Sequence, residues 1–118
     1  MMGININDKY YPFTDLILSG VKTIETRVSP SLHAYIGQRV GIIRTGKDKA
    51  MLVGFMTIGE PIQYETEKHF RNDEEKHCVP KGSKYDISGL GKWGYPIINP
   101  VRIEPRHVAS KGIVARKI

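Results

Sequence analysis

The feature that most constrains how this chain folds is a corner, at which a short helix stops at a glycine and leads directly into a strand. Residues 13–18 carry apolar side chains at helical spacing, which predicts a helix with one buried face. Gly20 follows, and a glycine just past a helix end predicts a left-handed backbone conformation. Residues 22–28 are rich in β-branched side chains and predict a strand.

Alternation along this predicted strand divides its side chains between two faces. One face carries Lys22, Ile24, Thr26 and Val28. We expect that face to point inward because Ile24 and Val28 are apolar. Glu25 and Arg27 then lie side by side on the other face, with Lys22 at the entrance to the strand. Such a pair is ordinarily a solvated surface pair of little energetic value, but three ionisable groups within six residues make this segment the first candidate for a site.

Residues 20–27 fit the pattern Gly-x-Lys-x-x-Glu-x-Arg, which resembles the signature of ASCH domains, a branch of the PUA-like superfamily. Residues 12–19 are similar to the helix before that motif. Residues 91–95 and 111–114 resemble the last two strands of the family, so the resemblance covers most of the chain. It implies a mixed α+β fold over residues 1–118: one small PUA-like β-barrel of five to six strands with two to three short peripheral helices.

The remaining patterns are compatible with such a barrel. Short strands are predicted at residues 3–7, 39–45, 50–62, 92–104 and 112–118, and a helical turn at residues 31–36. Gly54 and Gly59 predict bends in the third of these strands. Pro96 and Pro100 predict that the fourth is an edge strand or has bulged pairing. Residues 64–79 predict a peripheral, partly irregular helix whose thin apolar face centres on Phe70.

Length and composition indicate a single soluble domain. The chain has 118 residues, of which 40% are apolar, enough for one core. Its one cysteine, Cys78, cannot form an internal disulfide, which favours a reducing compartment. Neither a secretory leader nor an apolar run of the ~18 residues that span a membrane is visible. We therefore expect a cytoplasmic protein that does not bind membranes, and we favour a monomer.

The charge of the chain is positive and uneven. The net charge is +6, and residues 81–118 carry eight basic and two acidic side chains. Residues 60–76 carry six acidic and three basic side chains. Such asymmetry suits a surface with one side that attracts anions, as in proteins that bind nucleic acid, although many small basic proteins bind none.

The ionisable residues of the corner suit an RNA or nucleotide ligand. Lys22 and Arg27 can donate to phosphates or base carbonyls, and Glu25 can accept from an exocyclic amine. Tyrosine and tryptophan side chains offer stacking surfaces, although Trp93 can equally be a packing residue. The candidate ligand-binding residues are Tyr11, Lys22, Glu25, Arg27, Arg44, Lys92 and Trp93. A protein adaptor that uses the barrel edge near Trp93 is a further alternative.

The resemblance also implies a catalytic alternative, because some ASCH-like proteins are ribonucleases and others are amidohydrolases that act on acylated cytidine. The catalytic candidates would be Lys22, Glu25 and Glu74, with the lysine pKa lowered by burial. The chain departs from the amidohydrolase pattern in having Glu25 where a nucleophilic threonine is expected. The spacing of the four histidines and one cysteine does not predict a metal site, and we expect no cofactor.

Overall fold

A curled β-sheet forms the body of the protein in the computed structural model, which describes residues 1–89 and 91–118. Within these ranges the strands are β1 (Met2–Asn7), β2 (Ile24–Arg27), β3 (Arg39–Thr45), β4 (Met51–Ile58), β5 (Ile62–Tyr64), β6 (Lys92–His107) and β7 (Ala115–Lys117). The helices are α1 (Phe13–Leu18), α2 (Glu67–Asn72) and α3 (Glu74–His77), and a 3₁₀ turn covers His33–Tyr35. The predicted small mixed α+β fold with short peripheral helices is confirmed.

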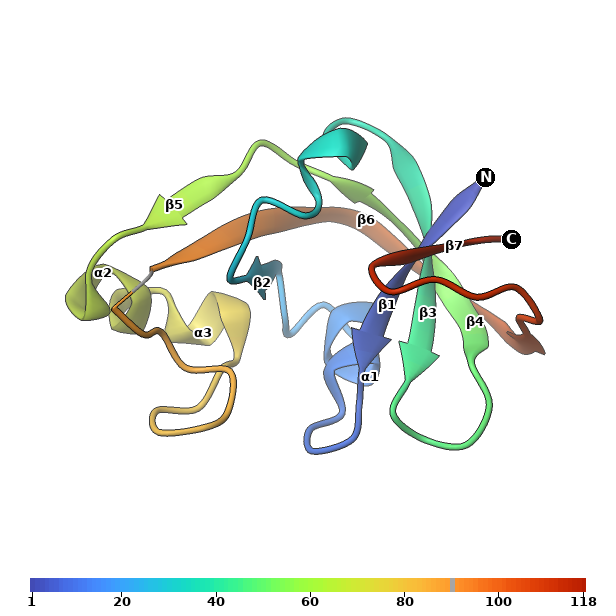
Figure 1. Cartoon of the computed structure of the whole chain (residues 1–118), viewed down its shortest axis with the longest axis horizontal. Coiled ribbons are helices and arrows are strands. Elements are labelled where there is room, and N and C mark those ends of the chain that lie inside the picture. Colours follow the sequence, from blue (N-terminus) through green and yellow to red (C-terminus); the bar gives the residue numbers. More distant parts are fainter. Residues whose placement is uncertain (90) are drawn as a thin grey trace.

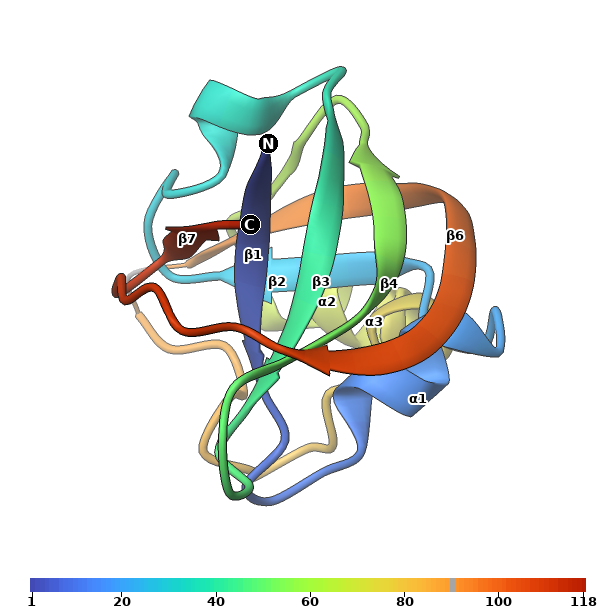
Figure 2. The same ribbon diagram turned by 90° about the vertical axis from the view of Figure 1, so that its right-hand side faces the viewer.

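The strands follow the order β2-β6-β4-β3-β1-β7, and β5 pairs with β6 beside that path. All neighbours are antiparallel except β1 and β3, which are parallel. Figure 2 shows the strands curving around a common interior, with β2 crossing behind β1 and β3. Because β2 and β7 end the path, the sheet is a half-barrel that is open between its two ends.

Strand β6 supplies most of the curvature. Its first half pairs with β2 and β5, and its second half pairs with β4 (Figure 1). The pairing with β4 shifts register twice, and at one shift Asn99 has a φ of 49°. Extra residues on one strand bend it and increase its twist. The prediction of bulged pairing near Pro100 is therefore confirmed. Among the described residues, the half of β6 that contains Pro100 pairs with β4 alone, so the predicted edge position also applies there, whereas the first half of β6 lies between β2 and β5.

The main core fills the interior of the half-barrel. Ile4 and Ile6 of β1 share its inner face, as predicted, and pack with Ile42 of β3. Helix α1 covers this interior with Phe13 and Ile17. Burial of these aliphatic and aromatic side chains is the main force that holds the helix against the sheet.

Helix α1 has well-defined ends. The buried Asp8 carboxylate accepts hydrogen bonds from the Thr14 backbone N–H at 3.0 Å and from the Thr14 hydroxyl. At the other end Gly20 has a φ of 82°, its N–H donates to the Ile17 carbonyl, and Val21 donates to the Leu16 carbonyl. This is the Schellman arrangement of a helix C-terminus. The predicted left-handed glycine is confirmed.

The predicted helix at residues 64–79 is divided into α2 and α3 at Asp73. Phe70 is buried and stacks on the ring of His77, with ring centroids 4.0 Å apart. The Val79 N–H donates to His77 Nδ1, and Cys78 between them has a φ of 59°. The Thr23 N–H donates to the Lys76 carbonyl, which holds the end of α3 beside the entrance to β2. None of the helices in the described ranges has the length and apolar character needed to cross a membrane.

Candidate functional site

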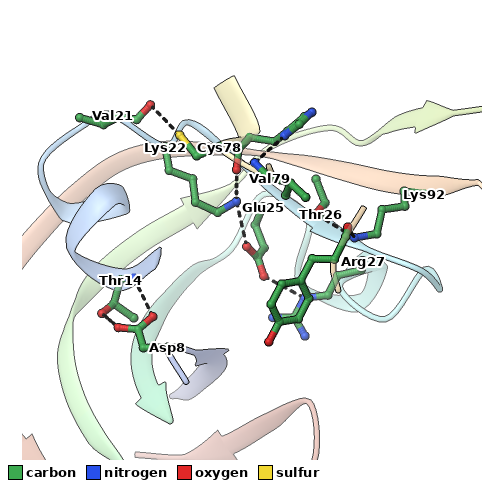
Figure 3. A network of polar contacts seen from close by, with 12 residues as sticks. Asp8, Thr14, Val21, Lys22, Glu25, Thr26, Arg27, Cys78, Val79 and Lys92 are labelled. Carbon is green, nitrogen blue, oxygen red and sulfur yellow. Dashed lines mark hydrogen bonds and ion pairs between the residues drawn. The ribbon is translucent and has the colours of Figure 1, made fainter. Parts of the chain in front are cut away.

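The corner after Gly20 directs Lys22 into the interior. Lys22 is only 2% exposed. Its Nζ donates to the His77 carbonyl at 2.5 Å and lies 3.5 Å from Glu25 Oε1 (Figure 3). The same Nζ lies 4.7 Å from the centre of the Phe13 ring. A carbonyl, a carboxylate and an aromatic face therefore replace the water that a lysine normally requires.

Glu25 connects Lys22 to Arg27, which in turn connects two strands. Arg27 Nε donates to Glu25 Oε2 at 3.1 Å, and Arg27 Nη2 donates to the Asn5 carbonyl of β1 at 2.8 Å. The three ionisable groups thus form a chain along the open side of the half-barrel, with β2 tied to β1 through one guanidinium.

The predicted orientation of this strand is wrong in part. Val28 was expected to point inward but is 61% exposed, while Glu25 is only 8% exposed. The reason is that β2 ends at Arg27 and lies at the end of the sheet path, so that its Glu25 side faces the interior of the half-barrel. Ile24 is buried as predicted, on a strand that pairs with β6 and contacts α3.

A pocket of about 410 Å³ lies at the open side of the half-barrel. Its charged lining residues are Lys22, Glu25, Arg27, Lys92 and Arg116. Its apolar walls include Phe13, Val79, Tyr85 and Ile113, and Asn5, Asn7, Thr26 and Thr45 add polar groups. The volume is that of a small-molecule site, which typically combines apolar walls with a few convergent polar groups. Four cationic side chains face one carboxylate.

Lys92 reaches the pocket from the first residue of β6. Its Nζ donates to the Tyr85 carbonyl and to Thr26 Oγ1 at 3.4 Å. Burial lowers the pKa of Lys92 to about 8, an effect that Glu25 opposes in part. Burial also lowers the pKa of Lys22, again against the favourable charge of Glu25. Perturbed lysines in one pocket are characteristic of functional sites, although structural ion pairs also perturb pKa values.

The other predicted site residues lie outside the lining of this pocket. Tyr11 packs against Tyr85, with ring centroids 6.4 Å apart, and so supports this residue of the pocket wall. Trp93 packs against the main core and against His33. Arg44 pairs with Ile6 in the sheet.

Glu74, the expected second carboxylate, is also outside the pocket lining. It lies at the start of α3 and forms an ion pair with Arg71 at 2.5 Å, with half of its side chain exposed. Glu74 therefore pairs with Arg71 and not with Lys22. Its role as a catalytic carboxylate stays a prediction. Within residues 1–89 and 91–118, no group of three His, Cys, Asp or Glu could hold a metal ion.

Sequence reasoning did not identify the wall of the pocket that the C-terminal segment provides. Asn5 Nδ2 donates to the carbonyls of Gly112 and Ile113, and Asn5 Oδ1 accepts from Arg116 Nε at 3.0 Å. Arg116 Nη1 also donates to the Ser110 carbonyl. These residues are more than 100 positions from Asn5, and only the pairing of β1 with β7 brings them together. The basic character of the C-terminal third was the available signal.

Comparison with known proteins identifies the fold. No family model matches this sequence. No curated protein matches it. The solved structures that resemble it include the ASCH protein of Zymomonas mobilis, with a TM-score of 0.71 and 18% identity over 91% of this chain and 73% of that one. Two single-residue mutants of that protein give TM-scores of 0.73 and 0.68, with 19% and 20% identity over 91% and 90% of this chain and 75% and 72% of theirs. The chain therefore has the fold of an ASCH domain.

Proposed function

We propose that this domain binds RNA or a nucleotide, with one nucleobase in the pocket beside Lys22, Glu25 and Arg27. The observation that carries the proposal is the composition of the pocket: four cationic side chains and one carboxylate between apolar walls. A nucleotide has a flat apolar face, a polar edge and an anionic phosphate. These three features correspond to the three kinds of side chain that line the pocket.

Glu25 can read the polar edge of a base. Each oxygen of a carboxylate can accept more than one hydrogen bond, so the contacts with Lys22 and Arg27 leave acceptor capacity. A carboxylate in this position accepts from an exocyclic amine and thereby favours cytosine, adenine or guanine over uracil. Tyr85 and Phe13 form an apolar wall against which a base can pack.

Calorimetric titration with the four nucleosides and their 5′-monophosphates tests this proposal. We expect the monophosphates to bind more tightly than the nucleosides, and bases with an exocyclic amine to bind more tightly than uracil. Arg27→Lys retains the charge but loses the planar fork, and should weaken binding about tenfold. Arg102→Lys is the matched control, because Arg102 pairs with Asp15 on the exposed surface. Failure of the wild-type protein to bind any of these compounds would contradict the proposal.

A hydrolase acting on RNA or on N4-acylated cytidine is the second candidate, and one observation favours it. The Thr26 hydroxyl lies 3.4 Å from Lys92 Nζ in the same pocket, so that a hydroxyl is present although position 25 is a glutamate. A lysine whose pKa is about 8 can accept the proton of such a hydroxyl as its oxygen attacks the amide carbonyl of N4-acylated cytidine, and can return that proton to the cytidine amine as the C–N bond breaks. Water then releases the acyl group from the Thr26 oxygen.

Turnover distinguishes the two candidates. The hydrolase predicts product from single-stranded RNA or N4-acetylcytidine, and predicts that Thr26→Val abolishes turnover while nucleotide binding changes little. Thr26→Ser should retain part of the activity, since it keeps the hydroxyl. Binding without product at high enzyme concentration would leave the first candidate and eliminate the second.

A further inference from the structure

Three loops meet at one end of the molecule beside the pocket. They are residues 8–12 after β1, residues 46–50 between β3 and β4, and residues 80–89 before β6, and both views place them at the same end (Figures 1 and 2). The Asp8 N–H donates to the Thr45 carbonyl, which joins the first two loops. The contact between Tyr11 and Tyr85 joins the first and third.

The exposed charge of these loops is almost entirely positive. Their five exposed lysines are Lys9, Lys47, Lys49, Lys81 and Lys84. Two of their three carboxylates are already occupied, because Asp8 is buried against Thr14 and Asp86 pairs with Arg71. Asp48 is the exposed carboxylate that remains. A strongly positive rim therefore borders one side of the pocket.

Tyr10 belongs to the first of these loops and is 52% exposed. Lys9 Nζ lies 5.4 Å and Lys84 Nζ 5.3 Å from the centre of its ring. Over residues 1–89 and 91–118, neither ammonium has a carboxylate within 4.0 Å. Contact with the ring offsets part of the repulsion between the two lysines, and an anion between them would offset more.

The rim is continuous with the pocket. Tyr10 is followed by Tyr11, whose ring contacts Tyr85 in the pocket wall. Asn7, which also lines the pocket, accepts a hydrogen bond from the Lys9 N–H at 2.8 Å. A chain molecule with one unit in the pocket would therefore pass over Tyr10 as it leaves.

We infer that this rim is a second subsite for single-stranded RNA, in which the nucleotide next to the bound base stacks on Tyr10 and the adjoining phosphates contact Lys9 and Lys84, the two ammonium groups beside that ring. An exposed aromatic ring with two cations beside it fits the alternation of base and phosphate in a single strand. An acidic peptide would use the cations but not the ring. The subsite rests on the proposed function, since it requires a base in the pocket.

The experiment compares a nucleoside monophosphate with a fluorescein-labelled single-stranded RNA of mixed sequence and roughly twelve nucleotides, a length within the range of single-strand sites. We expect the RNA to bind at least tenfold more tightly. Tyr10→Ala should weaken RNA binding about fivefold or more, and Tyr10→Phe should retain wild-type affinity because it keeps the ring. Lys9→Met and Lys84→Met should each lower the slope of log affinity against log salt by about 0.7. All four variants should bind the monophosphate like the wild type.

Lys68→Met on the exposed surface of α2 is the matched control for charge. An effect of Lys68→Met as large as that of Lys84→Met would reduce the rim to general electrostatic attraction and overturn the subsite. Equally effective competition by polyglutamate would do the same. If the monophosphate binds and the RNA binds no better, the subsite is wrong while the proposed function stands. If neither ligand binds, both fail.

Discussion

The ammonium of Lys22 lies 3.5 Å from a carboxylate oxygen of Glu25, and both side chains are almost completely shielded from solvent. Two opposite charges in such a place are favourable only together, because each has lost the water that would otherwise stabilise it. The pair therefore couples the stability of the fold to the chemistry of the pocket.

A double-mutant cycle measures this coupling. Glu25→Gln leaves the Lys22 ammonium without its counter-charge and should lower the free energy of unfolding by about 3 kcal/mol. Lys22→Met should cost a similar amount, because it leaves the Glu25 carboxylate with Arg27 alone. The double variant should cost clearly less than the sum of the two. Urea unfolding of the four proteins gives the coupling energy, and simple additivity would contradict the view of the two residues as one unit.

Glycine is required at position 20 by the backbone conformation and not by a lack of space around it. Its φ is 82°, and a Cβ added there would meet no atom within 4 Å. Gly20→Val should therefore destabilise the protein by more than about 1 kcal/mol through backbone conformation alone. Gly89→Ala is the matched control, because Gly89 has equally open surroundings and no positive φ. Equal melting temperatures for the wild type and Gly20→Val would show that the corner does not depend on this residue.

Local sequence patterns predicted the elements of this fold better than their orientation. Gly20 and the helical spacing before it are determined within a few residues, and both were correct. The direction of Val28 was wrong because alternation gives two faces but does not say which is inside, and β2 lies at the end of the sheet path. The choice depends on the strand order, which no local pattern contains.

The same limit applies to the pocket. Lys22, Glu25 and Arg27 were predicted together because they are close in sequence, and the structure joins them. Asn5 and Arg116 were missed because the contact between them depends on the pairing of the first strand with the last. Trp93 was proposed as a ligand residue for its chemistry, but the same ring packs against the core.

The lowered pKa of Lys92 predicts a pH dependence for binding. At pH values below about 8 the ammonium is charged and attracts an anionic ligand, so affinity for a nucleoside monophosphate should fall as the pH rises from 7 to 9. Lys92→Met should bind more weakly at pH 7 and lose most of this dependence. Lys68→Met on the exposed surface should keep it. Titrations across this range in buffers of constant ionic strength provide the measurement.

The stability of the unliganded protein should rise with pH between about pH 8 and pH 10.5, whereas the affinity for a nucleoside monophosphate should fall with pH. The folded pKa of Lys92 is about 8 and the ordinary lysine pKa is 10.5. Between these values the unfolded chain binds more protons than the folded one, so this residue makes the free energy of unfolding rise with pH. Below about pH 8 both states are protonated and the contribution is constant. Lys92→Met should make the rise smaller, leaving the part that comes from Lys22, whose pKa burial also lowers. An unchanged slope in that variant would show that Lys92 does not contribute.

Asn5 should control the order of the C-terminal wall of the pocket. Its side-chain amide donates to two carbonyls of that segment at 2.9 and 3.0 Å and accepts from Arg116. Asn5→Asp preserves the shape and the contact with Arg116 but replaces the amide donor by an oxygen that cannot bond to either carbonyl. We expect amide hydrogen exchange in residues 110–117 to become about tenfold faster, while exchange in α1 stays unchanged.

The affinity of Asn5→Asp for a nucleoside monophosphate should also fall, because Arg116 then loses its fixed position in the pocket. Asn7→Asp is the control for the exchange measurement, since the Asn7 side-chain oxygen accepts from the Lys9 N–H and its replacement keeps that bond. If exchange in the C-terminal segment does not change in Asn5→Asp, then β7 pairing alone holds the wall, and the amide of Asn5 has no part in shaping the pocket.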